Sequence, residues 1–338
     1  MKAGPDTTLE KQLLGWLKPV SRSFYLSIRF LPRRIRPTVA TAYLLARASD
    51  TIADATALPA DVRLEALRLF PEALRRDDAG FVNLVRECAR YQQTQGEKAL
   101  LEVLPRIVET ARKLPEGHRR LVEEVLQKIL RGQSLDLVRF ETGAGEVRAL
   151  QKDDELDEYT YLVAGCVGEF WTKLCLLEWP RYGDLPGPEL VNLGVRFGKG
   201  LQLINVLRDA GADLRHGRCY LPVAVAPERL RTEPELAAGV FRLWLGRAID
   251  QLEAAWTYTG HIRPPAVRFA CALPALIGIR TLRRLTQAPS LSHGIKVSRR
   301  EVYALAALAL AAALWQPAHR WIGRGEFGVR GSEFGVRS

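Results

Sequence analysis

The chain has 338 residues, of which 47% are hydrophobic and 26% are charged, and its formal net charge is +11. This composition is that of a folded globular protein and excludes a collagen-like or fully disordered chain. The positive charge favours an anionic partner, such as nucleic acid, acidic lipid or a phosphorylated small molecule. The five cysteines are widely spaced, odd in number and form no Cys-x-x-Cys pair. They argue against a disulfide framework and a zinc site, and are typical of a reducing cytosol.

Helical patterns dominate the chain, and strand signals are nearly absent. Apolar side chains recur at helical spacing in segments 61–76, 98–113, 119–140, 154–178, 189–214, 235–260, 265–286 and 299–315. Proline and glycine residues fall between these segments, where helices are expected to end. Since no Gly/Ser linker divides the chain, we predict an N-terminal segment over 1–18 and one all-α domain over 19–316.

The two ends of the chain carry weaker signals. The first residues contain no long apolar stretch, so we expect no signal peptide and a cytoplasmic location. The apolar run at 303–315 has 13 residues, whereas a membrane span needs about 20, so a buried or interfacial helix is expected there. The sequence EFGVR occurs at 326–330 and again at 333–337. We therefore predict a disordered extension over 317–338.

Two aspartates interrupt an otherwise apolar helical segment, LLARASDTIADAT at 44–56. Asp50 and Asp54 are four residues apart, and Tyr43 and Arg47 precede them at helical spacing, so all four would share one helix face. Acidic pairs at this spacing arise by chance roughly four times in a chain of this composition, mostly on solvated faces. The pair alone therefore does not indicate a site.

A second segment repeats the pattern, which changes its interpretation. Asp209 and Asp213 are four residues apart in an apolar helical segment, and Gln202 and Asn205 continue the stripe on the same face. Unpaired buried carboxylates are costly, and a divalent cation removes that cost. Mg²⁺ prefers one or two carboxylates together with water and substrate phosphates. We therefore predict that the two pairs hold Mg²⁺ and a diphosphate.

Two other carboxylate chemistries fit less well. A di-iron bundle would need Glu-x-x-His repeats, and none of the five histidines has that spacing. A two-carboxylate glycoside hydrolase is open in principle, but nothing in the sequence specifies a sugar site.

Five sequence blocks occur in order between about residues 20 and 285. They are SRSF at 21–24, YLLARASDTIAD at 43–54, YTYLVAGCVG at 159–168, QLINVLRDAGAD at 202–213 and GRCYLP at 217–222. Together they resemble the motifs of the squalene and phytoene synthases, all-α enzymes that join two prenyl diphosphates head to head. The Asp-Thr form of the first aspartate block is closer to squalene synthases.

The resemblance implies a single-domain, isoprenoid-synthase-type helical bundle with a central cavity, and a role for each site residue. Asp50, Asp54, Asp209 and Asp213 would bind Mg²⁺ as catalytic residues, with Asn205 assisting. Arg47 and Arg218, and less directly Arg22 and Arg208, would hold diphosphate oxygens. The remaining residues that would contact substrate are Ser21, Phe24, Tyr43, Tyr159, Val163, Gly165, Gln202 and Tyr220, with Tyr159 also expected to be catalytic. Glycines near Val163 would leave room for an isoprenoid chain or serve close helix packing, and both interpretations stay open.

The implied function is a transferase that condenses two prenyl diphosphates, with two farnesyl diphosphates as the first expectation. The reaction would pass through a cyclopropyl diphosphate to squalene or a squalene-like C30 product. Phytoene-type condensation of geranylgeranyl diphosphate, a reaction that stops at presqualene diphosphate, and an inactive interaction protein of the same fold remain open. NADPH would be needed only for squalene, and the Gly143-Ala144-Gly145 segment lacks a Rossmann fingerprint.

The partners expected from the sequence follow from this assignment. The basic cluster of Arg29, Arg33, Arg34 and Arg36 has no interleaved aromatic residues and no reader motif, so we expect no nucleic acid. A prenyl diphosphate is the expected substrate, and peripheral contact with an anionic membrane is a further candidate. The oligomeric state is left open.

Overall fold

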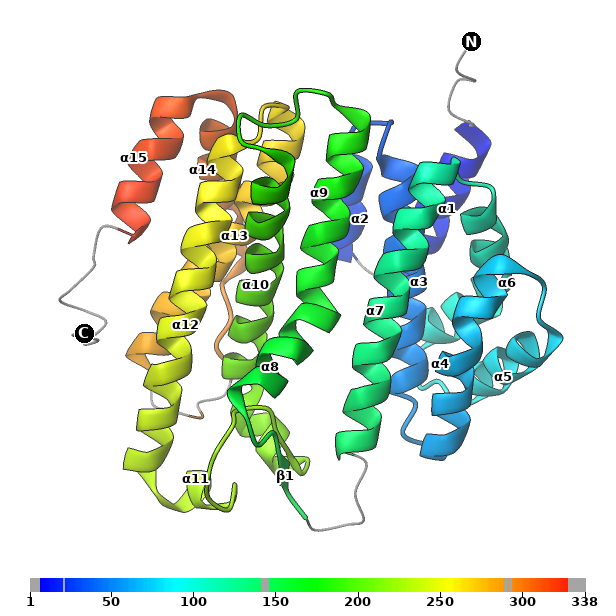
Figure 1. Cartoon of the computed structure of the whole chain (residues 1–338), viewed down its shortest axis with the longest axis horizontal. Helices are drawn as coiled ribbons and strands as arrows, with labels where there is room; N and C mark the ends of the chain where they lie inside the picture. Colours follow the sequence, from blue (N-terminus) through cyan, green and yellow to red (C-terminus); the bar gives the residue numbers. More distant parts are fainter. Residues whose placement is uncertain (1–6, 21, 141–145, 289–290, 292–293, 328–338) are drawn as a thin grey trace. The chain divides into compact units, whose positions relative to one another are not determined.

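The computed structural model describes residues 7–20, 22–140, 146–288, 291 and 294–327. Side chains are described for these residues except at 7, 22–24, 26 and 326–327. The chain groups into two compact units, residues 1–141 with 173–180, and residues 142–172 with 181–338. The prediction of an all-α fold is confirmed (Figure 1).

The first unit is built from helices alone in its described part. They are α1 (Thr7–Val20), α2 (Arg22–Arg29), α3 (Arg36–Ala53), α4 (Ala60–Arg75), α5 (Ala79–Arg90), α6 (Gln95–Arg112) and α7 (Glu116–Phe140), with the last residues of α9 (Cys166–Glu178). Helix α3 packs against α1, α4, α6 and α7. Its apolar side chains Leu44, Leu45 and Ile52 are fully buried. The helix therefore has a fixed position in the unit, because it is surrounded by neighbours on several sides.

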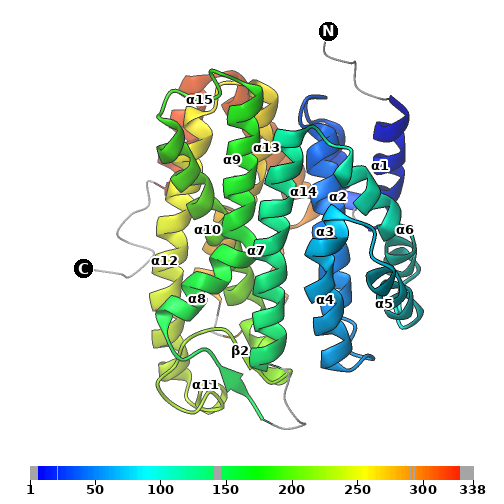
Figure 2. The ribbon, with the colours of Figure 1, turned by 45° about the vertical axis from the view of Figure 1, so that its right-hand side comes forward.

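The second unit contains the remaining elements. They are β1 (Arg148–Ala149), α8 (Asp153–Thr160), the π-helix η1 (Tyr161–Gly165), most of α9, α10 (Gly187–Arg215), β2 (Arg218–Cys219), α11 (Arg229–Thr232), α12 (Pro234–His261), α13 (Pro265–Gln287), α14 (Arg299–Leu314) and α15 (Gln316–Phe327). Helix α10 packs along α12 and also against η1 and α13. Figures 1 and 2 show α10 beside α12 and α13. The predicted helical segments agree with these helices to within a few residues, although Gly96, expected between helices, lies in the first turn of α6.

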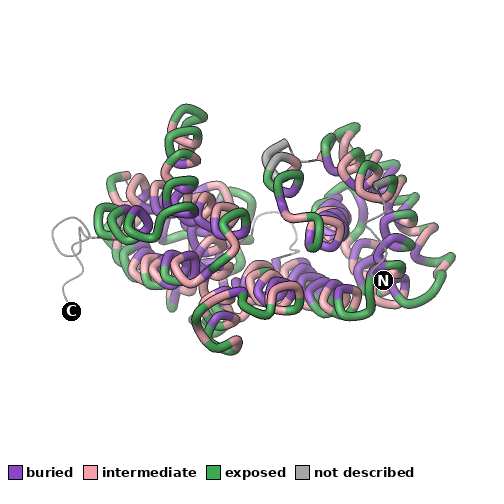
Figure 3. Tube along the Cα trace, turned by 90° about the horizontal axis from the view of Figure 1, so that it is seen from above, coloured by how far each residue is buried: buried purple, intermediate pink, exposed green. Residues whose placement is uncertain are grey.

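Burial follows the helical period in both units. In Figure 3 the buried stretches alternate with exposed ones along each helix, as expected for amphipathic helices. Helix α13 alone, among the helices in the described ranges, is long and apolar enough to cross a membrane. Because 56% of its apolar window is buried by other parts of the protein, the same composition also suits a core helix.

The C-terminal segment differs from the sequence expectation. Residues 316–327 form helix α15, which begins at the predicted domain end and covers the first part of the stretch 317–338 that was expected to be disordered. Residues 328–338 lie outside the described residues. The physical reason is burial: Ala318, His319 and Ile322 are nearly inaccessible to solvent. The His319 ring stacks on Trp256 of α12 with ring centroids 4.3 Å apart, and its Nε2 lies 2.8 Å from Thr259 Oγ1.

The burial of His319 predicts an acid-sensitive contact. Burial first, then the nearby Arg268 and His261 charges, lower the pKa of His319 to about 4. Because the unfolded chain binds the proton more tightly, the contribution is fully present above about pH 6.5 and is lost as the pH falls towards 4. Between about pH 6.5 and 4 the unfolding free energy of the parent protein should therefore fall as His319 takes up a proton. In a His319→Gln variant we expect this fall to be smaller by about 2–3 kcal/mol.

Chemical denaturation of both proteins at several pH values measures the difference. His216→Gln, at an exposed histidine, is the matched control and should follow the parent protein. An unchanged slope in His319→Gln would show that this histidine does not govern acid stability.

Candidate functional site

The first aspartate pair lies at the C-terminal end of α3. Asp50 is in the last turn of the helix and partly buried, and Asp54 is the exposed residue that follows its end. The backbone N–H of Asp54 donates to the carbonyl of Asp50 at 2.8 Å, so the helical turn continues through the pair. Tyr43 and Arg47 are partly buried on the same helix. The structure thus brings together the four residues of the predicted first stripe.

The carboxylate of Asp50 has a partner that the sequence did not reveal. Gln133 of α7 donates through Nε2 to Asp50 Oδ1 at 2.5 Å. Burial and the neighbouring Asp54 charge raise the pKa of Asp50 to about 6, against smaller opposing contributions from Gln133 and Arg47. The negative charge at Asp50 is therefore incompletely compensated by the protein, and a bound cation would stabilise it.

Arg47 is already engaged in an ion pair. Its Nη2 lies 2.8 Å from Glu97 Oε1 of α6, and both side chains are about 30% exposed. Glu97 also accepts a hydrogen bond from the Thr94 hydroxyl at the start of α6. The positive charge of Arg47 is consequently shared with an acid, and its expected role in holding a diphosphate stays a prediction.

Arg63 fixes the backbone on which the first pair is mounted. This fully buried side chain donates from Nη1 to the Ala53 carbonyl at 2.8 Å and from Nε to the Leu58 carbonyl at 3.1 Å. The Ala53 carbonyl is at the end of α3, next to Asp54, and the Leu58 carbonyl lies in the connection that leads to α4. The last carbonyls of a helix have no partner within the helix. By donating to the Ala53 carbonyl, Arg63 stabilises the backbone at the end of α3, next to Asp54.

Replacing Arg63 with methionine is expected to lower the free energy of unfolding by about 2–4 kcal/mol, because two backbone carbonyls lose their donors. The same change should weaken Mg²⁺ binding by loosening Asp54. Thermal unfolding and Mg²⁺ titration measure the two effects, with Arg63→Lys as the control that retains the charge. Equal stability and equal affinity in Arg63→Met would contradict this role.

The second stripe lies along α10, as predicted. Gln202, Asn205, Arg208, Asp209 and Asp213 are partly buried, while the larger apolar residues between them, such as Leu203, Val206 and Leu207, are buried. Gln202 Oε1 accepts from Asn205 Nδ2 at 3.3 Å. Its amide nitrogen lies 3.5 Å from the hydroxyl oxygen of Tyr159, at the limit for a hydrogen bond. Gln202 thus contacts Asn205 along α10 and approaches Tyr159 of α8.

Asp209 is paired with its neighbour Arg208. The guanidinium donates twice to the carboxylate, from Nε at 2.9 Å and from Nη2 at 2.5 Å. This bond, with the charges of Asp209 and Asp213, raises the pKa of Arg208. A metal ion at Asp209 would have to displace this arginine or share the carboxylate with it. Arg208 therefore competes with a metal ion for the Asp209 carboxylate and is also a candidate to bind diphosphate.

Strand β2, which follows α10, carries Arg218 and pairs in parallel with β1. Arg148 and Ala149 of β1 pair with Arg218 and Cys219 of β2. Gly217 precedes β2 with φ of +79°, a conformation that favours glycine, and lets the chain turn out of α10. Tyr220 is buried and stacks on Tyr159 of α8, with ring centroids 4.8 Å apart. Tyr159 and Tyr220 thus lie beside Gln202 of the second stripe, and the expected contact of Arg218 with a diphosphate stays a prediction.

The valine and glycine block forms a π-helical turn. Val163 and Gly165 belong to η1, and π-helical turns occur frequently at functional sites. A Cβ atom on Gly165 would lie 2.9 Å from Lys199 Cγ, and one on Gly168 would lie 1.8 Å from the Gly194 carbonyl oxygen. Close packing of η1 and α9 against α10 therefore accounts for these glycines. A contact of Val163 or Gly165 with substrate stays a prediction.

The first sequence block is outside what the structure describes in detail. Ser21 lies outside the described residues, and Arg22 and Phe24 are in α2 without a described side chain. Their expected contacts with substrate stay predictions.

The oxygen donors of the first stripe fit a Mg²⁺ ion. Asp50 and Asp54 supply carboxylates, and Gln133 Oε1 is buried with no hydrogen-bond partner in the described part of the chain. Such hard oxygen donors suit Mg²⁺ rather than a softer metal. Among the described residues no three His, Cys, Asp or Glu side chains form a protein cage for a metal, and Mg²⁺ does not need one when substrate phosphates and water complete its shell.

A predominantly helical fold with two aspartate stripes is the arrangement expected from the sequence for a prenyl synthase. The sequence profile of the squalene/phytoene synthase family matches residues 17–301. The chain belongs to this family.

Curated relatives of the chain include plant and fungal squalene synthases. The squalene synthase of Nicotiana benthamiana is 27% identical over 299 residues, which are 84% of this chain and 66% of that protein. The squalene synthase of Saccharomyces cerevisiae is 27% identical over 286 residues, which are 82% of this chain and 62% of that protein. The chain thus spans less than two thirds of the length of these relatives.

Solved structures support the fold. The structure of TcSQS in complex with a ligand matches with a TM-score of 0.74 at 20% identity, covering 96% of this chain and 93% of that one. A dehydrosqualene synthase in complex with a ligand matches with a TM-score of 0.58 at 21% identity, covering 90% of this chain and 96% of that one. At this level of identity the likeness concerns the fold alone.

Proposed function

We propose that the protein is a prenyltransferase that condenses two prenyl diphosphates head to head. The observation that carries the proposal is the Asp50 carboxylate, held by Gln133 beside Asp54, with its pKa raised to about 6. A charge that the protein compensates so poorly is a place for a cation. Membership in the squalene/phytoene synthase family supplies the reaction class.

The aspartates and amides would bind the metal and the arginines would bind the leaving group. Asp50, Asp54, Asp209 and Asp213 would hold Mg²⁺, with Asn205 and Gln133 as neutral oxygen donors. When bound, Mg²⁺ would stabilise the negative charge that develops on a departing diphosphate. Arg218, and Arg47 and Arg208 after exchange of their acidic partners, would donate hydrogen bonds to diphosphate oxygens.

The aromatic residues near the second stripe would bind the apolar part of the substrate. Tyr159 and Tyr220 form a stacked pair, and Gln202 lies beside the Tyr159 hydroxyl. Their rings would contact the prenyl chain and exclude water from the reacting carbons. Val163 and Gly165 would contact the same prenyl chain.

The substrate expected first is farnesyl diphosphate, with squalene, a squalene-like C30 product or presqualene diphosphate as the outcome. Geranylgeranyl diphosphate with a phytoene-type product is the alternative. NADPH would act only in the reductive outcome. A cytoplasmic protein, with or without peripheral membrane contact, is the expected setting.

The test is incubation of the purified protein with farnesyl or geranylgeranyl diphosphate and Mg²⁺, with and without NADPH. Mass analysis of the extracted product, before and after phosphatase treatment, identifies chain length, reduction and any retained diphosphate. We expect a C30 product from farnesyl diphosphate that is absent when EDTA replaces Mg²⁺. Lack of any condensation product from either substrate would favour the inactive interaction protein.

A further inference from the structure

We propose that the exposed face of α14 docks on an anionic membrane surface. The face consists of Tyr303, Ala304, Ala307, Leu310, Ala311, Leu314 and Trp315, all exposed. Tyr303, Leu314 and Trp315 are 75%, 68% and 64% exposed, values that are unusual for large apolar side chains. Positions 303, 307, 310 and 314 follow the helical period, so they form one continuous stripe.

The opposite side of α14 is occupied by the protein. Leu305, Ala309, Ala312 and Ala313 are buried, and α14 packs against α13 and α15. The helix has 16 residues and is about 24 Å long, which is shorter than a membrane span. With one side committed to the fold, α14 can lie in a membrane interface but cannot cross it.

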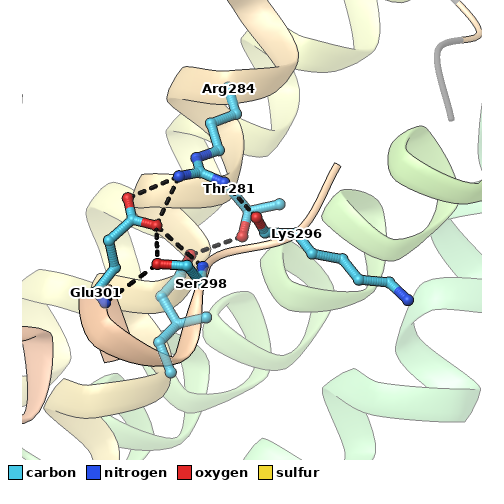
Figure 4. Close-up of polar contacts among 6 residues, drawn as sticks. Thr281, Arg284, Lys296, Ser298 and Glu301 are labelled. Carbon is cyan, nitrogen blue, oxygen red and sulfur yellow. Dashed lines mark hydrogen bonds and ion pairs between the residues drawn. The ribbon is translucent and has the colours of Figure 1, made fainter. Parts of the chain in front are cut away.

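Both ends of α14 are fixed, so the face is preformed. At the start, Ser298 and Glu301 form a capping box, and Arg284 of α13 donates to both carboxylate oxygens of Glu301 at 2.7 and 2.6 Å (Figure 4). At the end, the buried Arg268 donates to the Ala313 carbonyl at 3.1 Å. Docking would therefore cost little ordering of the helix.

The charges around the face favour anionic lipid. Residues 302–315 contain no charged side chain. The exposed residues Lys296, Arg299 and Arg300 precede this segment, and Arg320 and Arg324 of α15 follow it. Figure 4 shows the Lys296 side chain extending away from the Arg284–Glu301 cluster. Since Glu301 is neutralised by Arg284, the rim is basic.

The same charge distribution argues against a second copy of the chain as the occupant. Two such faces placed together would bring two basic rims into contact on molecules that each carry +11. Aromatic residues that flank an apolar helix face, here Tyr303, Trp315 and Trp321 of α15, prefer the membrane interface. Trp321 is 72% exposed.

The test uses the full chain and two kinds of vesicle, one of phosphatidylcholine and one that also contains phosphatidylglycerol. We expect sedimentation with the anionic vesicles, reduced by high salt. Leu310→Gln/Leu314→Gln and, separately, Arg299→Glu/Arg300→Glu should each weaken binding by about tenfold or more. The altered side chains are exposed, and acids at the start of a helix are favourable, so the variants should fold; thermal unfolding checks this.

Matched controls are Leu243→Gln on α12 and Arg86→Glu/Arg90→Glu on α5, all at exposed positions. They should bind vesicles like the parent protein. Absence of binding to anionic vesicles at low salt, or equal weakening by the controls, would overturn the proposal. It would also be overturned by a dimer in light scattering that Leu310→Gln/Leu314→Gln dissociates. Because no measurement uses turnover, the result is independent of the proposed function.

Discussion

Replacing Asp50 with asparagine is expected to stabilise the metal-free protein at pH 7 by about 1–2 kcal/mol and to lower turnover about 100-fold or more. The gain arises because the folded protein raises the pKa of Asp50 to about 6 from 3.8. For an acid with a raised pKa, the folded state holds its proton more tightly than the unfolded chain. Stability therefore falls as the pH rises from about 4 to about 6, and the full cost is present above pH 6. Asparagine keeps an acceptor for Gln133 without the charge.

The measurement is the difference in unfolding free energy between the parent protein and Asp50→Asn at several pH values, with and without Mg²⁺. We expect the difference to grow between pH 4 and 6 and to shrink when Mg²⁺ is added, since the cation stabilises only the parent carboxylate. Asp250→Asn, the same change at an exposed position of α12, should alter neither stability nor turnover. A less stable Asp50→Asn protein, or one that retains turnover, would refute the cation site.

Replacing Gly168 with alanine is expected to lower the free energy of unfolding by about 3 kcal/mol or more. The new methyl carbon would lie 1.8 Å from the Gly194 carbonyl oxygen and 3.2 Å from the Val195 nitrogen. Both are backbone atoms of α10, so no side-chain rotation relieves the overlap. The helices α9 and α10 would have to separate, and the Asp209 and Asp213 stripe lies on the helix that would move.

Denaturant unfolding and Mg²⁺-dependent turnover should both decline in Gly168→Ala. Gly239→Ala on α12 is the matched control, because nothing lies within 4 Å of the added carbon. There the better helix propensity of alanine should stabilise the protein by about 0.5–1 kcal/mol. Equal stability of Gly168→Ala and the parent would mean that η1, α9 and α10 pack less closely than described.

The sequence predicted most of the helices because their signals are local. Apolar period and Pro/Gly breakers located α4, α6, α7, α10, α12, α13 and α14 to within a few residues. Helix α5 was not predicted, although Asp78 accepts from the Phe81 N–H and caps it. Helix α15 was also not predicted. It is stabilised by contacts of His319 with Trp256 and Thr259, about 60 residues earlier in the chain.

Helical spacing in the sequence predicted which candidate site residues share a helix face, but not which other side chains contact them. Helical spacing alone places Asp50 with Asp54 and Asp209 with Asp213, because residues four apart share a face. Arg208 was adjacent to Asp209 in sequence, yet its double hydrogen bond required a particular side-chain conformation. The glycine block had two possible roles, room for substrate and close helix packing. The contacts with α10 account for the packing role, and a contact with substrate stays a prediction.

The sequence by itself determined an all-helical chain, two aspartate stripes and the family to which they belong, since each is encoded within a few consecutive turns. Only the tertiary structure decided which groups surround those aspartates. Gln133 meets Asp50 across 83 residues of sequence, and Glu97 meets Arg47 across 50. Such partners depend on how whole helices pack, which fixes the burial of a carboxylate and hence its pKa. The exposed side of α14 was decided in the same way, because an apolar helix does not specify which of its faces the fold will cover.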